Sequence, residues 1–256
     1  MVDRVPNDLD WRIEENCFNA FPSLKQALLD GWFVRFADGL SRRANSANAL
    51  HAGFASVERV IDAVETLYRR AQQPPIFRVP SFLAPGVEEV LAARGYTGEG
   101  VTRVLYGPME GLAAQADPAV EMSPHAGSDW LSAMGTLQGH GAKERVTYRR
   151  IVRSVAVPVA FAALRVDGRL AALAYGAVSN GLLCYESVIT DPRRRRQGLA
   201  RRIVAALADW GRDQGADGAC LQVIGDNTPA IALYDAFGLK TDLYGYRYWR
   251  APAAAN

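Results

Sequence analysis

Cysteine, histidine and net charge are all scarce in this sequence of 256 residues. It has three cysteines and three histidines, and its formal net charge is +2. Cys17, Cys184 and Cys220 lie far apart and form no CxxC pair, which argues against a disulfide framework or a cysteine-rich zinc site. The histidines show no metal-ligand spacing. We therefore expect no metal and a reducing compartment.

Long apolar runs are also missing. No window approaches the roughly 18 uninterrupted apolar residues of a transmembrane helix, and the acidic, polar N-terminus differs from a signal peptide. Hydrophobic residues make up 49% and charged residues 22% of the chain, which is typical of a soluble globular protein. The small net charge gives no sign of a nucleic-acid partner. We expect a cytoplasmic protein that binds neither nucleic acid nor membrane.

The length is large for one ordinary domain and sufficient for two. Residues 108–118 contain two prolines, a glycine and several alanines with little periodicity, which is typical of a linker. We place a boundary there and predict two domains, residues 1–112 and 118–256.

The first half alternates helical and strand patterns. A helical pattern over residues 9–29, broken at Phe21-Pro22, precedes a strand over 32–36. The polar stretch 40–50 is either a second strand or a loop. After it we expect a helix from Val57 capped by Ser56, a strand at 76–80, a helix at 85–94 and a strand at 101–106. This order predicts an α/β fold.

The second half has a denser pattern of strands. We expect helices at 128–137 and 143–155, strands at 158–166, 170–178 and 182–190, a helix at 198–214, a strand at 219–224, a helix capped by Thr228 and a strand at 243–249. The dipeptide Asp167-Gly168 predicts a hairpin between the first two of these strands.

An arginine-rich turn precedes the helix at 198–214. Free backbone N–H groups at a helix start and the helix dipole attract anions, and the small Gly198 and Ala200 let a phosphate approach the backbone. Six arginines fall within residues 193–202, and the rest of the chain is acidic. This concentration favours a diphosphate site over a merely solvated basic surface.

Two motifs of the second half resemble the GNAT superfamily of acetyl-CoA-dependent N-acyltransferases. The first is the turn Arg/Gln-x-x-Gly-x-Gly/Ala, matched by Arg195, Gly198 and Ala200. The second is an asparagine, an alanine three residues on, a Leu-Tyr pair and an aromatic-Gly ending, matched by Asn227, Ala230, Leu233-Tyr234 and Phe237-Gly238. The resemblance covers roughly residues 118–250.

The resemblance implies a mixed, mostly antiparallel sheet with a central splayed pair of parallel strands flanked by helices. Acetyl-CoA would be the co-substrate, with no metal, and would lie in the split between the two strands. Its pantetheine arm would pair with the backbone of Val188, Ile189 and Thr190. The resemblance assigns the remaining cofactor contacts to Arg195, Arg196, Gln197, Gly198, Leu199, Ala200, Asn227, Ala230 and Tyr234.

The same resemblance implies catalytic roles. Tyr234 would protonate the departing thiolate, because a phenol with a pKa of about 10 suits a thiol leaving group. Some family members carry a glutamate base five residues before the asparagine, but this chain has Gln222 there. Glu186 is the replacement we would test as the base, although a plain structural hydrogen bond or a water chain to solvent are alternatives.

The first half has an order of helices and strands similar to that of the GNAT fold, but it lacks the diphosphate turn. It is either a degenerate GNAT-like copy, which would make the chain a tandem GNAT, or an unrelated α/β extension. Its densest polar cluster, residues 42–48, contains Arg42, Arg43, Asn45, Ser46 and Asn48. This cluster is either a hydrogen-bonded loop or part of the acceptor pocket or domain interface.

The function that these features predict is acetyl transfer from acetyl-CoA to a primary amine by direct attack in a ternary complex. The acceptor would be a small molecule or an amino acid-like compound, and the enzyme a monomer or homodimer. Acetylation of protein N-termini or lysines is one alternative. A non-catalytic module that binds or senses acyl-CoA is another, and it would need no acid at Tyr234.

Overall fold

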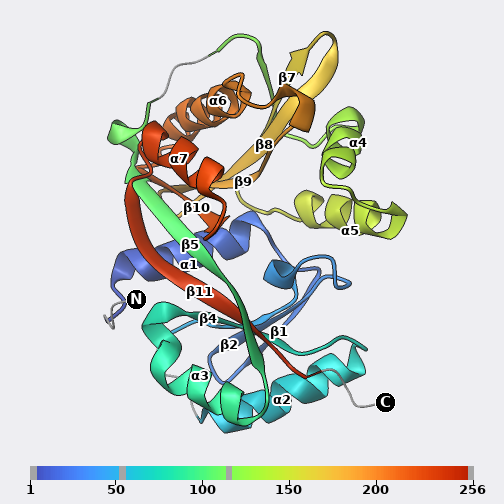
Figure 1. The fold of residues 1–256 in the computed structure, drawn as a ribbon, viewed down its shortest axis with the longest axis vertical. Helices are drawn as coiled ribbons and strands as arrows, with labels where there is room; N and C mark the ends of the chain where they lie inside the picture. Colours follow the sequence, from blue (N-terminus) through green and yellow to red (C-terminus); the bar gives the residue numbers. More distant parts are fainter. Residues whose placement is uncertain (1–4, 52–55, 114–116, 253–256) are drawn as a thin grey trace.

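A single mixed sheet connects both halves of the chain (Figure 1). The structure is a computed structural model that describes residues 5–51, 56–113 and 117–252. Within these residues the sheet has eleven strands in the order β1-β2-β3-β4-β11-β5-β10-β9-β8-β7-β6. The strands are β1 (Lys25–Leu29), β2 (Trp32–Phe36), β3 (Ala47–Ala49), β4 (Ile76–Pro80), β5 (Thr97–Pro108), β6 (Val120–Ser123), β7 (Val159–Val166), β8 (Arg169–Ser179), β9 (Leu182–Thr190), β10 (Gly218–Ile224) and β11 (Thr241–Arg250).

Helices cover the sheet on both faces. They are α1 (Asp8–Ala20), α2 (Val57–Arg70), α3 (Ala84–Ala93), α4 (Ser128–Leu137), α5 (Ala142–Arg153), α6 (Leu199–Asp213) and α7 (Thr228–Phe237). Side chains of β8 alternate between two cores: Ala172 and Ala174 pack with α6, whereas Leu173 and Tyr175 pack with α4 and α5. Helix α6 and the pair α4 and α5 therefore lie on opposite faces of the sheet (Figure 1). In the described residues, no helix is long and apolar enough to span a membrane.

Most predicted elements are confirmed, and the corrections are local. The helical pattern over 9–29 is wrong beyond Ala20, since the chain leaves α1 at Phe21 and residues 25–29 form strand β1. The polar stretch 40–50 contains a short 3₁₀ helix, η1 (Arg42–Ala44), and the three-residue strand β3.

The second half needs two further corrections. Strand β6 follows the predicted linker and was not predicted from the sequence, and residues 114–116 of that linker lie outside the described residues. Helix α7 is capped by Asn227 and not by Thr228, because the Asn227 side chain accepts a hydrogen bond from the Ala230 N–H. The Asp167-Gly168 hairpin is confirmed: both residues have positive φ, of 51° and 72°, as a type I′ turn requires.

Each half contains one parallel strand pair joined through a helix. In the first half β3, α2 and β4 make this unit, and in the second half β9, α6 and β10 make it. In both halves a further helix and a long strand follow, namely α3 with β5 and α7 with β11. The two halves thus share the order strand, helix, parallel strand, helix and strand.

The long last strands of the two halves are exchanged. β5 of the first half pairs with β10 of the second, and β11 of the second pairs with β4 of the first. β5 and β11 also pair with each other. Helix α1 reinforces this junction, because Ile13 and Cys17 pack in one apolar core with Phe77 of β4 and with Leu182 and Cys184 of β9.

Candidate active site

The two parallel strands β9 and β10 part from each other in the middle of the sheet. They pair at three positions, ending at Cys184 and Cys220. Beyond that point β9 stays paired with β8 and β10 stays paired with β5. The strands therefore splay as the sequence predicts, and their facing backbone edges are released from each other.

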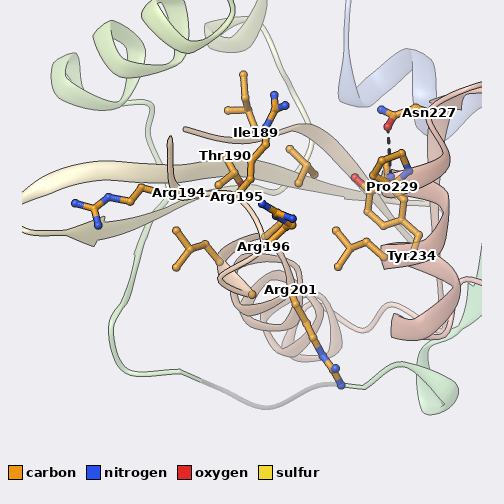
Figure 2. A pocket seen from close by; sticks show the side chains of 15 residues that line it. Ile189, Thr190, Arg194, Arg195, Arg196, Arg201, Asn227, Pro229 and Tyr234 are labelled. Atoms are coloured by element: carbon orange, nitrogen blue, oxygen red, sulfur yellow. Dashed lines mark hydrogen bonds between the residues drawn. The ribbon is translucent and has the colours of Figure 1, made fainter. Parts of the chain in front are cut away.

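A cavity of about 630 Å³ opens at this splay, between β9, the start of α6 and α7 (Figure 2). Eleven of the twelve residues predicted to contact the co-substrate line it; Gln197 does not. The lining residues that the sequence analysis missed are Arg194, Arg201, Pro229 and Leu233. All four are direct or helical neighbours of predicted residues, so the two motifs alone could have located them.

The start of α6 presents free backbone donors to the cavity. Gly198 is the residue that caps the helix, and its φ of 72° lies in the left-handed region that glycine adopts without strain. A Cβ added to Gly198 would meet no atom within 4 Å. Among the described residues, no hydrogen bond occupies the N–H groups of Gly198, Leu199 or Ala200. This is the geometry of an anion site at a helix N-terminus.

The arginines around this turn fall into two groups. Arg194 is paired with Asp167, and Arg202 is paired with Asp117. The other four, Arg193, Arg195, Arg196 and Arg201, have no ion pair within the part of the chain that the structure describes. Figure 2 shows Arg194 extending to the left and Arg201 extending downward, with Arg196 near the middle of the view. The unpaired guanidinium groups supply positive charge next to the free N–H groups.

Tyr234 lies on the wall of the cavity opposite this turn (Figure 2). The residue is 7% exposed, and its hydroxyl makes no hydrogen bond to any described residue. Burial, followed by the nearby Glu186 carboxylate, raises the pKa of the Tyr234 phenol well above its ordinary value. The phenol therefore keeps its proton through the neutral and mildly alkaline range, but its pKa no longer matches that of a thiol as its ordinary value would.

Glu186 lies on β9, on the sheet face away from α6, and is 2% exposed. Unlike Tyr234, it is not among the residues that line the cavity. Its carboxylate is paired with Arg43 of the first half: Nη1 donates to Oε1 at 2.8 Å, and Nη2 lies 2.8 Å from Oε2. Burial raises the pKa of Glu186 to about 7, and Arg43 acts in the opposite direction. A carboxylate that titrates near neutral pH is suited to general-base chemistry.

A bulge in β9 separates Glu186 from the predicted pantetheine strand. Tyr175 of β8 faces Glu186 and Leu173 faces Ile189, so Ser187 and Val188 together face one residue. Ser187 has a positive φ of 53°, and its hydroxyl accepts a hydrogen bond of 2.8 Å from the Tyr148 hydroxyl. A bulge of this kind takes backbone groups out of the ladder. The bulge includes Val188, the first of the three residues whose backbone is expected to pair with the pantetheine arm.

The polar cluster of the first half belongs to the contact between the halves. Its Arg43 reaches Glu186 of β9, and its Arg42, which pairs with Glu99 of the first half, lies 4.6 Å from the centre of the Tyr248 ring of β11. The cluster is also a hydrogen-bonded loop, since the buried Asn45 side chain bonds the backbone of Ala37, Gly39 and Ser41.

The three cysteines, far apart in sequence, converge in the structure. They come from α1, β9 and β10, and their sulfur atoms lie within 4.8 Å of one another. No sequence pattern indicates this convergence, because only tertiary structure joins the three segments. All three side chains are buried and pack in the same apolar core as Ala177 and Leu182, so we assign them to that core.

Comparison with known proteins decides the family. A family model described as "Probable histone acetyltransferase Rv0428c C-terminal" matches residues 11–249. The chain belongs to this family. It is a GNAT-superfamily protein, an acyltransferase of the N-acetyltransferase type. The match begins at residue 11, so it includes the first half, which the sequence motifs alone did not.

Two curated relatives are similar in sequence to different portions of the chain. "Uncharacterized N-acetyltransferase YobR" of Bacillus subtilis is 21% identical over 90% of this chain and 94% of its own length. "Mycothiol acetyltransferase" of Clavibacter sepedonicus is 35% identical, over 33% of this chain and 28% of its own length.

Solved structures show the GNAT fold. A GCN5-related N-acetyltransferase from Kribbella flavida has a TM-score of 0.70 at 18% identity, covering 96% of this chain and 95% of that one. A "Tandem GNAT protein from the clavulanic acid biosynthesis pathway" has a TM-score of 0.64 at 15% identity, covering 92% and 86%.

Proposed function

We propose that this enzyme transfers the acetyl group of acetyl-CoA, bound in the cavity of the splayed strands, to a primary amine of a small-molecule or amino acid-like acceptor. One observation carries the proposal. The cavity joins a helix N-terminus with free donors, an open backbone edge and a protonated phenol within a single space.

The residues present fit the parts of acetyl-CoA. The free N–H groups from Gly198 to Ala200, with Arg195 and Arg196, would hold the pyrophosphate. The edge of β9 from Val188 to Thr190 would pair with the amide groups of the pantetheine arm, since β10 no longer occupies it. Paired in this way, the arm would direct the thioester toward the bulge and Tyr234.

The chemistry follows as direct transfer in a ternary complex. The acceptor amine loses a proton to Glu186, and its nitrogen forms the new bond to the thioester carbon. The carbon–sulfur bond breaks, and Tyr234 gives its proton to the departing thiolate. A backbone N–H at the bulge would stabilise the oxyanion that forms between these steps.

A small acceptor suits the surroundings of Glu186. The carboxylate lies beneath η1 and the Arg43 guanidinium, so the approach to it is covered by the first half of the chain. The family description names a histone acetyltransferase and the Clavibacter relative is named for mycothiol, so both macromolecular and small acceptors are represented. The test below therefore includes peptides, so that acetylation of protein amines can be detected.

We also propose that the chain is a tandem GNAT whose first copy, residues 1–112, is degenerate and whose second copy, residues 118–256, holds the co-substrate. The shared order of elements and the two parallel strand pairs support this division. So does the likeness of the whole chain to a tandem GNAT structure.

The test is release of free thiol from acetyl-CoA in the presence of amino acids, polyamines, aminoglycosides and peptides. We expect turnover with at least one small primary amine and a product that is heavier by one acetyl group. Turnover that depends on a protein N-terminus or lysine would assign the protein-acetylating alternative. Tight acetyl-CoA binding without turnover of any amine would contradict the proposal.

A further inference from the structure

Arg43 reaches the candidate base from the other half of the chain. It belongs to η1, which lies between β2 and β3, whereas Glu186 lies on β9. Both terminal nitrogens of its guanidinium lie 2.8 Å from a carboxylate oxygen. The Arg43 side chain is 24% exposed, and the Glu186 side chain is 1% exposed. Arg43 is therefore the more exposed partner of the pair, and the carboxylate is fully buried.

Other contacts fix Arg43 in this position. Its guanidinium lies 4.3 Å from the centre of the Phe21 ring. Its backbone carbonyl accepts a hydrogen bond of 2.7 Å from Arg35, which is fully buried and also donates to the Phe21 carbonyl. The side chain is thus packed, and its backbone is held by a second arginine. An exposed ion pair between mobile side chains would lack both restraints.

The carboxylate has no second guanidinium partner among the described residues. Cys184 lies near, with its Sγ 3.9 Å from Oε1. The titratable and charged groups that face Glu186 from the packed elements are Arg43 of η1, Arg35 of β2, Cys17 of α1, Tyr148 of α5, Tyr175 of β8, Cys184 of β9 and Tyr234 of α7. Burial by these neighbours favours the protonated acid, and Arg43 is the direct contact that favours the carboxylate.

We propose that Arg43 is a positioning residue, with which the first half of the chain keeps the Glu186 carboxylate oriented and ionised for proton abstraction in the second half. This inference rests on the proposed function. It assigns the first half a defined role in the reaction, although that half has no diphosphate turn.

The consequence is a shift in the pH profile with a definite sign. The base acts when it has lost its proton, so kcat/KM rises with pH through the pKa of Glu186 in the free enzyme. Arg43→Met removes the positive charge that lowers this pKa. An opposite charge in contact lowers a carboxyl pKa by about 1–3 units. The acid limb, which is the part of the profile where kcat/KM rises with pH, should therefore shift to higher pH by about that amount. From a pKa of about 7, activity at pH 7 falls about 5- to 500-fold and recovers toward higher pH.

The experiment compares kcat/KM profiles of four proteins with one acceptor amine, so the ionisation of the acceptor is common to all. Arg43→Lys keeps the charge, and its acid limb should lie between those of Arg43→Met and the wild type. Arg42→Met removes the neighbouring arginine, which pairs with Glu99, and its limb should stay at the wild-type pH. Acetyl-CoA affinity, measured by calorimetry, should match the wild type in every variant, because Arg43 does not line the cavity.

The outcomes separate the inference from the proposed function. A wild type inactive with every amine would contradict the proposed function. An active wild type whose acid limb is unchanged in Arg43→Met would overturn the positioning role, as would an equal loss of activity at every pH. The positioning role would be supported if the acid limb shifts to higher pH in Arg43→Met and lies closer to the wild-type pH in Arg43→Lys.

Discussion

Replacing Gly198 by leucine tests the diphosphate site at the start of α6. A Cβ added at this position meets no protein atom within 4 Å, and Gly198 lines the cavity. The leucine side chain would occupy the space in front of the free N–H groups of the helix start. The change should therefore leave the fold intact and remove the place where the pyrophosphate binds.

Two free-energy terms of different size follow from this geometry. Gly198 has a φ of 72°, and a residue with a side chain is destabilised by about 1–2 kcal/mol in that region. For a chain of this length, the midpoint of thermal unfolding should fall by about 2–8 °C. Each hydrogen bond to a charged group contributes about 1.5–3 kcal/mol. Losing two bonds to the pyrophosphate should raise the Kd for acetyl-CoA about 10²- to 10⁴-fold.

Gly215 supplies the matched control at the other end of the same helix. It has a φ of 79°, and a Cβ added there would likewise meet nothing within 4 Å, yet Gly215 does not line the cavity. Gly215→Leu should therefore lower the unfolding temperature by a similar amount and leave the Kd unchanged. Calorimetric titration with acetyl-CoA measures both variants. The reasoning fails if Gly198→Leu binds as the wild type does, or if both variants lose affinity equally.

Three further predictions test the site and the core. Tyr234→Phe should lower kcat by about 10²-fold or more through loss of the general acid and leave the Kd for acetyl-CoA almost unchanged; unchanged turnover would refute the acid role. Arg196→Gln should weaken acetyl-CoA binding about tenfold at low salt and much less at high salt. Arg194→Gln should weaken binding less, because Arg194 is already paired with Asp167; equal effects of the two variants would contradict the division into paired and unpaired arginines. Ellman's reagent should find no reactive thiol in the native protein and three after unfolding, because all three cysteines are buried; rapid labelling of the native protein would contradict their place in the core.

The cavity proposed for the co-substrate was predictable because the residues that line it are local in sequence. A turn, its arginines and the helix that follows occupy one short segment, and a helix start attracts anions wherever it lies in a fold. The second motif adds Asn227 and Tyr234 from one further helix. The structure brings both segments to one cavity. The two local motifs therefore predicted most of the residues that line this cavity.

The acceptor side could not be predicted in the same way, since it depends on contacts between distant segments. Nothing near Arg43 in the sequence indicates that it pairs with Glu186, 143 residues later. The convergence of three cysteines and the exchange of β5 and β11 depend likewise on the order of strands in the sheet. Strands β3 and β6 are three and four residues long, which is too short for alternation to reveal them.

The strand exchange provides a structural basis for the proposed positioning of Glu186 by Arg43 of the other half. Two domains joined by a surface contact are expected to move relative to each other, and displacements of about 1 Å are enough to impair a catalytic arrangement. Here β5 and β11 bond to each other and to the opposite halves, so the ladder of hydrogen bonds continues from β4 to β10. Helix α1 adds a shared apolar core beneath the same strands. The Arg43–Glu186 contact is thus built on one continuous sheet, as the role proposed for the first half requires.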